Sequence, residues 1–249
     1  MFEEFRIVKN VGCLAPMPVV DNIAHEFYAL APKNIMLSVI PMGVEKFTRE
    51  EVEEIMKPLD EQLEHFIIRK VDLVQHSGVP LLLAIGIERH DDRLKRIEDR
   101  VGCPATSSLT GAVAAAKRLG IRRLAFANNF PPELNEEMRK FFERDGIAVV
   151  GFQGRIGPQR DHAAIKRIDS LQHMHDAHAH CKRGLDRFPD CDGLYMGGGS
   201  ARLTPVVAQL EKEYGKPVIG HQDAMAWDIL TRLGCWRPVP GFGRLLASA

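Results

Sequence analysis

The segment CPATSSLTGAVAAAKRLGIRR at 103–123 and the segment KPVIGHQDAMAWDILTRLGCWR at 216–237 follow one pattern. Each places a proline before a short strand, then a small polar turn, then a helix that ends in Leu-Gly. Upstream of each, a strand runs into a turn of small residues, VDLVQHSGVP at 71–80 and CDGLYMGGGS at 191–200. Self-similarity of this kind indicates repeated βα units. We therefore predict two pseudo-symmetric halves, each a mostly parallel sheet flanked by helices.

Short apolar runs alternate with longer amphipathic stretches along the rest of the chain, which is typical of βαβ units and an α/β fold. The first half is expected to comprise residues 1–112 plus 222–249, and the second half residues 113–221. Ligands of parallel sheets bind outside the carboxyl ends of the strands, so we expect the active site in a cleft between the halves. Strands are expected at 6–14, 35–41, 72–76, 122–127, 147–152, 192–196 and 217–220.

Charge and composition narrow the class of protein. Lys and Arg number 33, as do Asp and Glu, so the formal net charge is zero. A nucleic-acid or anionic-membrane binder would need a basic surplus or stripe, so neither partner is expected. The apolar stretches, such as 79–87, are too short to span a bilayer, and the N-terminus lacks the features of a secretory signal. Scattered cysteines without a CxxC pair are typical of a reduced, cytoplasmic protein.

Two glycine-containing turns at matching places in the halves are the main candidates for a ligand site. Glycine lets the backbone approach a ligand and aim several N–H groups at one anion. A helix N-terminus behind each turn would favour a carboxylate. The alternative is that both are ordinary βα turns, but their matching positions favour a site. The residues concerned are His76, Ser77, Gly78, Gly197, Gly198, Gly199 and Ser200.

The candidate catalytic residues are His76, Ser77 and His221. Because His76 and Ser77 are adjacent, their side chains point to opposite faces of a strand and cannot form a directly bonded nucleophile pair. Either could still donate a hydrogen bond or a proton into the site. His221 lies with Asp223 in the equivalent turn of the second half. An unperturbed imidazole titrates at ~6.5 and suits acid–base work, although a structural role for a histidine at a strand end is the alternative.

Four histidines gather on one predicted helix at about 169–186, namely His173, His175, His178 and His180. The outer two share one face of the helix and the inner two share another. Such pairs could bind zinc or nickel, but a metal site needs a third ligand and an enclosed geometry. We interpret this helix as solvated or as an interface, and we predict no metal. Motifs of phosphate loops, zinc proteases, nucleophile elbows and dinucleotide-binding turns do not occur.

Taken together, the two turns and the repeat resemble the Asp/Glu racemase superfamily, and in particular its arylmalonate decarboxylase and maleate isomerase branch. CPATSSLTGAVAAAKRLGIRRLAFAN at 103–128 is similar to the central strand and helix of that family. DGLYMGGGSARLT at 192–204 lies where the family has its second active-site turn. The closing GKPVIGHQDAMAWDILTRLG and PGFGRLL at 240–246 resemble the decarboxylase C-terminal pattern. The resemblance implies a cofactor-free, metal-free reaction on a small carboxylate, and a fold that often pairs into homo-oligomers.

The sequence departs from this family at both turns. The resemblance implies a cysteine in each turn of the racemases, covalent addition by one cysteine in the isomerases, and a single proton-donating cysteine in the second turn of the decarboxylases. Ser77 stands at the first of these positions and Gly198 at the second. Serine is a far weaker acid than a thiol, so neither two-thiol racemisation nor addition by a turn cysteine is expected. Phe130 replaces a tyrosine donor of the decarboxylases, and Pro16 and Asn128 complete the aligned substrate-binding positions.

Among the reactions of the family, decarboxylation depends least on the cysteines and the tyrosine donor that this sequence lacks. Loss of CO₂ needs an apolar seat for the leaving carboxylate and donors for the developing charge. The proton could come from His76, His221 or water. An isomerase, hydratase or lactone hydrolase that uses histidine fits almost equally well. A protein that binds small carboxylates without catalysis is the alternative from another class.

Overall fold

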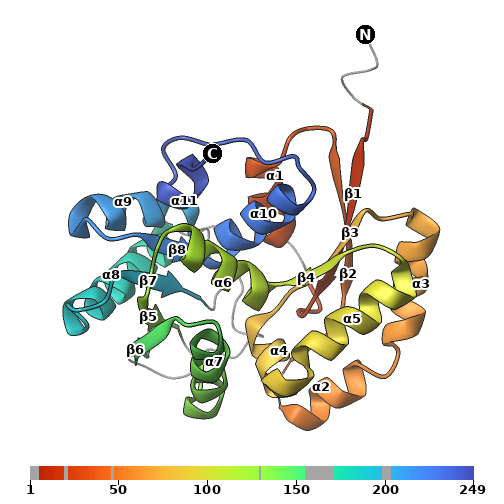
Figure 1. The fold of residues 1–249 in the computed structure, drawn as a ribbon, viewed down its shortest axis with the longest axis horizontal. Helices are drawn as coiled ribbons and strands as arrows, with labels where there is room; N and C mark the ends of the chain where they lie inside the picture. Colours follow the sequence, from red (N-terminus) through yellow and green to blue (C-terminus); the bar gives the residue numbers. More distant parts are fainter. Residues whose placement is uncertain (1–5, 20–21, 46–47, 129, 155–170, 198–202) are drawn as a thin grey trace. The chain divides into compact units, whose positions relative to one another are not determined.

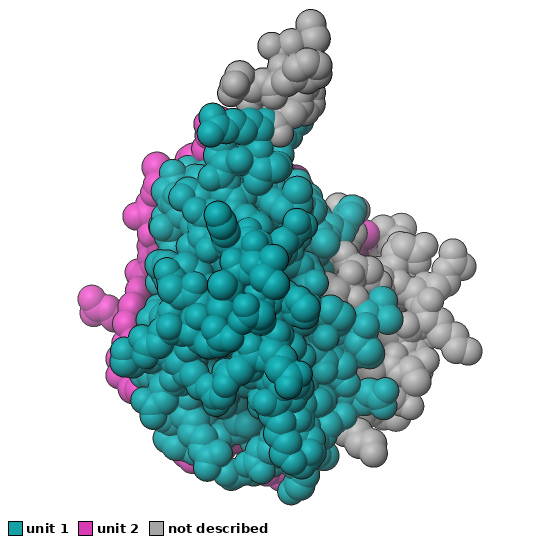
Figure 2. All heavy atoms as spheres, turned by 90° about the vertical axis from the view of Figure 1, so that its right-hand side faces the viewer, with its two compact units in different colours: residues 1–111, 229–236 teal, residues 112–228, 237–249 magenta. Residues whose placement is uncertain are grey.

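The computed structural model describes the chain except for residues 1–5, 20–21, 46–47, 129, 155–170 and 198–202 (Figure 1). Residues 1–111 and 229–236 form one unit, and residues 112–228 and 237–249 form another (Figure 2). The sequence analysis assigned residues 222–249 to the first half. Of these, 229–236 group with the first unit, and 222–228 and 237–249 group with the second.

The first unit is built on a four-stranded sheet in the order β2-β1-β3-β4, in which every neighbouring pair is parallel. Strands β3 and β4 are buried along their whole length, as expected for a parallel sheet covered on both faces. The register sets Cys13 opposite Gln75 and His76 opposite Ser107. The strands are β1 (Lys9–Ala15), β2 (Ile35–Pro41), β3 (Leu73–His76) and β4 (Ala105–Ser107).

The helices of this unit include α3 and α5, which pack against each other and against the sheet. Phe66 of α3 lies against the backbone of β1, where a Cβ on Gly12 would come within 2.9 Å of its ring. Ion pairs of 2.6 Å join Arg96 to Asp60 and Arg100 to Glu64 across the two helices. The helices are α1 (Asn22–Leu30), α2 (Arg49–Ile55), α3 (Leu59–Arg69), α4 (Val79–Ala84), a 3-10 turn (Ile87–Arg89) and α5 (His90–Val101).

The second unit repeats the first sheet. Its order is β6-β5-β7-β8, again with all neighbouring pairs parallel, so the strands follow the same second-first-third-fourth sequence. This confirms the predicted α/β class with a parallel sheet flanked by helices in each half, while the predicted cleft between the halves stays a prediction. The strands are β5 (Arg123–Ala127), β6 (Ala148–Gln153), β7 (Gly193–Met196) and β8 (Val218–Gly220).

Two apolar layers hold the second sheet. Phe126, Phe152 and Tyr195 meet on one face with ring centroids 5.1–5.4 Å apart, and Phe142 of α7 packs onto Phe126. Helices α8 and α9 pack against the strands with a second buried apolar cluster. The remaining helices are α6 (Ser108–Arg118), α7 (Pro132–Arg144), α8 (Leu171–Arg187), α9 (Thr204–Tyr214), α10 (His221–Arg232) and α11 (Arg244–Ala247). Among the described residues, no helix has the length and apolar character needed to cross a membrane.

Candidate functional site

In the second unit, His221 and Tyr195 meet at the carboxyl ends of β7 and β8. His221 is the first residue of α10, directly after β8, and Ile219 of β8 pairs with Tyr195. Because side chains alternate along a strand, His221 returns to the face on which Tyr195 lies. The Tyr195 hydroxyl is 3.0 Å from Nδ1 of His221. Sequence analysis identified His221 but missed Tyr195, which resembles any buried aromatic residue of a strand.

This contact fixes the protonation of His221. Burial lowers the pKa of His221 to about 4 and raises the pKa of Tyr195 well above its usual range. Both side chains are therefore neutral at neutral pH. Among the described residues the phenol proton has no acceptor other than Nδ1, so the phenol donates and Nδ1 accepts. A neutral imidazole carries one proton, which must then be on Nε2. No residue in the described part of the chain bonds Nε2, so His221 can donate from it to a ligand.

The turn after β7 depends on glycine at position 197. Gly197 donates its N–H to Ala127 across 3.1 Å, which ties the turn to β5. A Cβ at this position would lie 2.5 Å from Cε1 of Tyr195, so glycine lets the chain pass over the ring. The other predicted residues of this turn, Gly198, Gly199 and Ser200, lie outside the described residues.

Asn128 and Phe130 lie together in the turn that follows β5. Asn128 is fully buried, and its Oδ1 accepts the Phe130 N–H across 3.1 Å. Its amide nitrogen lies 3.7 Å from the sulfur of Met138. Both polar atoms of the Asn128 side chain thus bond protein groups, which gives this residue the role of shaping the turn.

In the first unit, the predicted residues Pro16 and Gly78 are in direct contact. Gly78 has a φ of +98°, and a Cβ on it would lie 2.6 Å from Cγ of Pro16. Ser77 donates its N–H to Leu14 across 2.9 Å, and its Oγ lies 3.5 Å from Sγ of Cys13. Burial raises the pKa of the Cys13 thiol to about 11, so it stays protonated. A thiol therefore does reach the first turn, but it comes from β1.

His76 is fully buried at the end of β3, on the face opposite to Ser77. Its Nδ1 is 3.4 Å from the Ser77 carbonyl oxygen. Burial, and next the charge of Arg93, lower the pKa of His76 to about 3, so the ring is neutral at neutral pH. His76 is therefore not the protonated imidazolium that a general acid would have to be.

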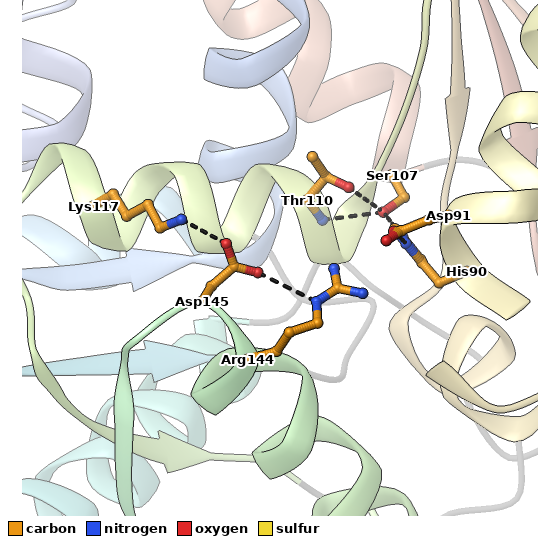
Figure 3. A network of polar contacts seen from close by, with 7 residues as sticks. All are labelled: His90, Asp91, Ser107, Thr110, Lys117, Arg144 and Asp145. Carbon is orange, nitrogen blue, oxygen red and sulfur yellow. Dashed lines mark hydrogen bonds and ion pairs between the residues drawn. The ribbon is translucent and has the colours of Figure 1, made fainter. Parts of the chain in front are cut away.

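A hydrogen-bonded network that the sequence analysis missed lies beside His76, in the same unit. Nδ1 of His90 is 2.8 Å from Asp91 Oδ1, and Nε2 is 2.8 Å from Ser107 Oγ. Ser107 Oγ also accepts the N–H of Thr110 and lies 3.1 Å from its hydroxyl, as the dashed lines of Figure 3 mark. Ser107 thereby caps α6 and holds the His90 ring in one orientation.

The histidine-rich helix is α8. Nε2 of His178 lies 3.0 Å from Glu213 of α9, and Lys182 pairs with the other oxygen of the same carboxylate. Among the residues that the structure describes, no three metal-ligating side chains come together. The side chain of His173 lies outside them.

The family model described as arylmalonate decarboxylase matches residues 11–246. The chain belongs to the arylmalonate decarboxylase family. The arylmalonate decarboxylase of Bordetella bronchiseptica is 26% identical over 152 residues, which is 60% of this chain and 60% of that protein, less than two thirds of its length. A maleate isomerase of Pseudomonas putida is 23% identical over 230 residues, 89% of this chain and 88% of the isomerase.

A solved maleate cis-trans isomerase of Nocardia farcinica, a cysteine-to-serine mutant with a covalently bound succinylcysteine intermediate, has the same fold. The TM-score is 0.79 at 20% identity, and the alignment covers 96% of this chain and 98% of the isomerase. These findings confirm the resemblance drawn from the sequence, and the relatives support an enzyme of the lyase or isomerase class. In this member of the arylmalonate decarboxylase family, neither 76–78 nor 197–202 contains a cysteine.

Proposed function

We propose that this chain is a cofactor-independent decarboxylase of small carboxylates of the arylmalonate type. The observation that carries the proposal is the Tyr195–His221 contact of 3.0 Å, which leaves a neutral histidine with an Nε2–H, at the end of β8, that bonds no residue in the described part of the chain. Family membership and the relatives' names support the substrate class. Pro16, Ser77 and Gly78 stay predicted substrate contacts.

In the proposed reaction, an arylmalonate loses one carboxylate as CO₂, and the electron pair of the broken C–C bond stays on the α-carbon. The charge spreads onto the remaining carboxylate as an enediolate, which accepts the hydrogen bond of His221 Nε2. Water then gives a proton to the α-carbon, which yields the monocarboxylate and hydroxide. A fixed neutral donor suits this step because it is oriented before the charge develops. Neutral imidazole donors of this kind are known in other enzymes.

Two alternatives have less support. One alternative is addition of a cysteine to the substrate, the chemistry indicated by the succinylcysteine of the Nocardia farcinica isomerase. Neither turn of this chain contains a cysteine, and the Cys13 thiol that reaches the first turn from β1 is buried and protonated. General acid–base catalysis by histidine is disfavoured because burial lowers the pKa of both His76 and His221 below 5. A protein that binds carboxylates without catalysis is an outcome of the test.

The test is incubation of the purified protein with phenylmalonate and, separately, with maleate, followed by NMR of the products. We expect phenylacetate from phenylmalonate, with activity retained after dialysis against EDTA. His221→Ala should lower kcat/KM by about 10²–10³, the usual cost of an oxyanion donor. His178→Ala, on the surface of α8, is the matched control and should keep full activity. Binding of phenylmalonate without turnover by the wild type would show that the chain is a binding protein instead.

The pH dependence separates a donor from a general acid. If His221 only donates, kcat/KM has no inflection at the ordinary histidine pKa of ~6.5. An inflection there that disappears in His221→Ala would show that the imidazolium carries the reaction.

A further inference from the structure

Arg93 of α5 holds a buried nitrogen without a partner. Its Nη1 is buried and forms no hydrogen bond to any residue that the structure describes, while the side chain as a whole is partly exposed. Burial, with the charges of Arg89 and Arg96, lowers the pKa of Arg93 to about 10, so the guanidinium remains charged at neutral pH. Buried charges are normally paired or hydrogen-bonded, so this one is suited to an anion.

His76 of β3 supplies a second polar group without a hydrogen-bond partner among the described residues, on the sheet that α5 packs against. Its side chain is fully buried, and no described residue bonds Nε2. The charge of Arg93 also lowers the pKa of the His76 ring. His76 pairs in register with Ser107, whose hydroxyl holds His90, and His90 lies three residues before Arg93 on one face of α5.

Arg93 Nη1 and His76 Nε2 need hydrogen-bond partners of opposite kinds. Nδ1 of His76 faces the Ser77 carbonyl oxygen, which can only accept, so the proton of the neutral ring is on Nδ1. Nε2 is then an acceptor and needs a donor, whereas Arg93 is a donor and needs an acceptor. A carboxylate alone satisfies Arg93 and leaves Nε2 without a donor. A hydroxyl beside a carboxylate satisfies both.

We propose that Arg93 and His76 bind a small 2-hydroxycarboxylate, with its carboxylate on Arg93 Nη1 and its hydroxyl donating to His76 Nε2. This site lies within the first unit and does not rest on the proposed decarboxylation, which depends on His221 of the second unit. The partly exposed Arg93 side chain gives the ligand its first contact from solvent.

The experiment compares two probes that differ by one hydroxyl, tartronate and malonate, by calorimetric titration of the wild type and three variants. We expect the wild type to bind tartronate about five- to tenfold more tightly, the value of one hydrogen bond. His76→Asn, which keeps an amide at the place of Nδ1 and lacks Nε2, should lose this preference. Arg93→Gln should weaken both ligands at least about tenfold.

Arg96→Gln is the matched control, because Arg96 lies three residues further along α5 and pairs with Asp60 on the surface. It should bind both probes as the wild type does. Equal affinity of the wild type for tartronate and malonate, or unchanged binding by Arg93→Gln, would overturn the proposal.

A second measurement needs no variant and identifies the place of binding. Phenylglyoxal modifies arginine side chains, and peptide mass spectrometry reports each arginine separately. Tartronate should protect Arg93 and leave Arg96 as reactive as before. Arg93 that reacts at the same rate with and without tartronate would equally overturn the proposal, whether or not Arg93→Gln folds.

Discussion

The Tyr195 hydroxyl donates to Nδ1 of His221 across 3.0 Å, between the end of β7 and the start of α10. This one contact decides which nitrogen of the histidine carries the proton. The raised pKa keeps the buried phenol protonated, and among the described residues its proton has no acceptor other than Nδ1. In the sequence, Tyr195 looks like an ordinary buried aromatic residue of a strand. Its hydrogen bond nevertheless determines that His221 donates from Nε2.

Tyr195→Phe tests this relationship. The substitution removes one hydroxyl and keeps the ring that packs on Phe126, so the fold should persist. Without the donor to Nδ1, the proton of His221 is no longer fixed on Nε2, and we expect kcat/KM for phenylmalonate to fall about tenfold or more. Tyr214→Phe is the control, because that hydroxyl bonds Asp186 on the surface and should not matter. Unchanged kinetics in Tyr195→Phe would contradict the tautomer argument.

The two buried histidines should make the fold sensitive to acid. In the unfolded chain a histidine titrates at ~6.5, whereas the folded pKa is about 3 for His76 and about 4 for His221. Between these values the unfolded state binds more protons, so the free energy of unfolding decreases as the pH falls below ~6.5, by up to about 1.4 kcal/mol per pH unit for each histidine.

Urea unfolding across this pH range measures the effect. Carboxylates also titrate there, so the decisive quantity is the difference between the wild type and His76→Asn. The variant should lose one histidine's share of the pH dependence and should be less sensitive to acid. Parallel pH curves for the two proteins would show that His76 does not stay neutral in the fold.

The fold could be predicted from the sequence because the repeat indicates the order in which strands, turns and helices are connected, as well as the elements themselves. The same strand–turn–helix order on both sides led to sheets with the same strand order, β2-β1-β3-β4 and β6-β5-β7-β8. Local patterns do not reveal the contact that holds the C-terminal residues. The buried carboxylate of Glu211 accepts the N–H of Val218 at 2.9 Å and that of Arg244 at 2.8 Å, tying α9, β8 and α11 together.

The candidate site was predictable only at the strand ends, where turns of small residues mark it. Pro16 and Gly78 were chosen independently and lie in contact. Arg93 and His90 could not be chosen, because they lie on α5, a helix so rich in charge that its inward-facing polar residues look like surface residues. Only packing shows that Nη1 of Arg93 is buried.

Gly78→Ala should destabilise the first unit more than an ordinary glycine replacement does. Gly78 and Gly102 both have positive φ, at +98° and +78°, so alanine strains the backbone at either position. Only at Gly78 would the new Cβ also meet a rigid ring, 2.6 Å from Cγ of Pro16, whereas nothing lies within 4 Å at Gly102. We expect each to cost about 1–3 kcal/mol by strain, with Gly78→Ala clearly the larger in urea unfolding. Equal costs would mean that the turn can move away from Pro16.

The last prediction concerns Cys13, the one thiol at the first turn. Its Sγ lies 3.5 Å from Ser77 Oγ, but the side chain is fully buried and its pKa is raised to about 11. A protonated, enclosed thiol is neither a nucleophile nor open to alkylation. Iodoacetamide should therefore leave phenylmalonate turnover unchanged, and Cys13→Ala should change kcat/KM by less than about tenfold, with Cys103→Ala as the control. A larger loss in a Cys13→Ala protein that still folds would mean that β1 supplies, through Ser77, the acid that the two turns lack.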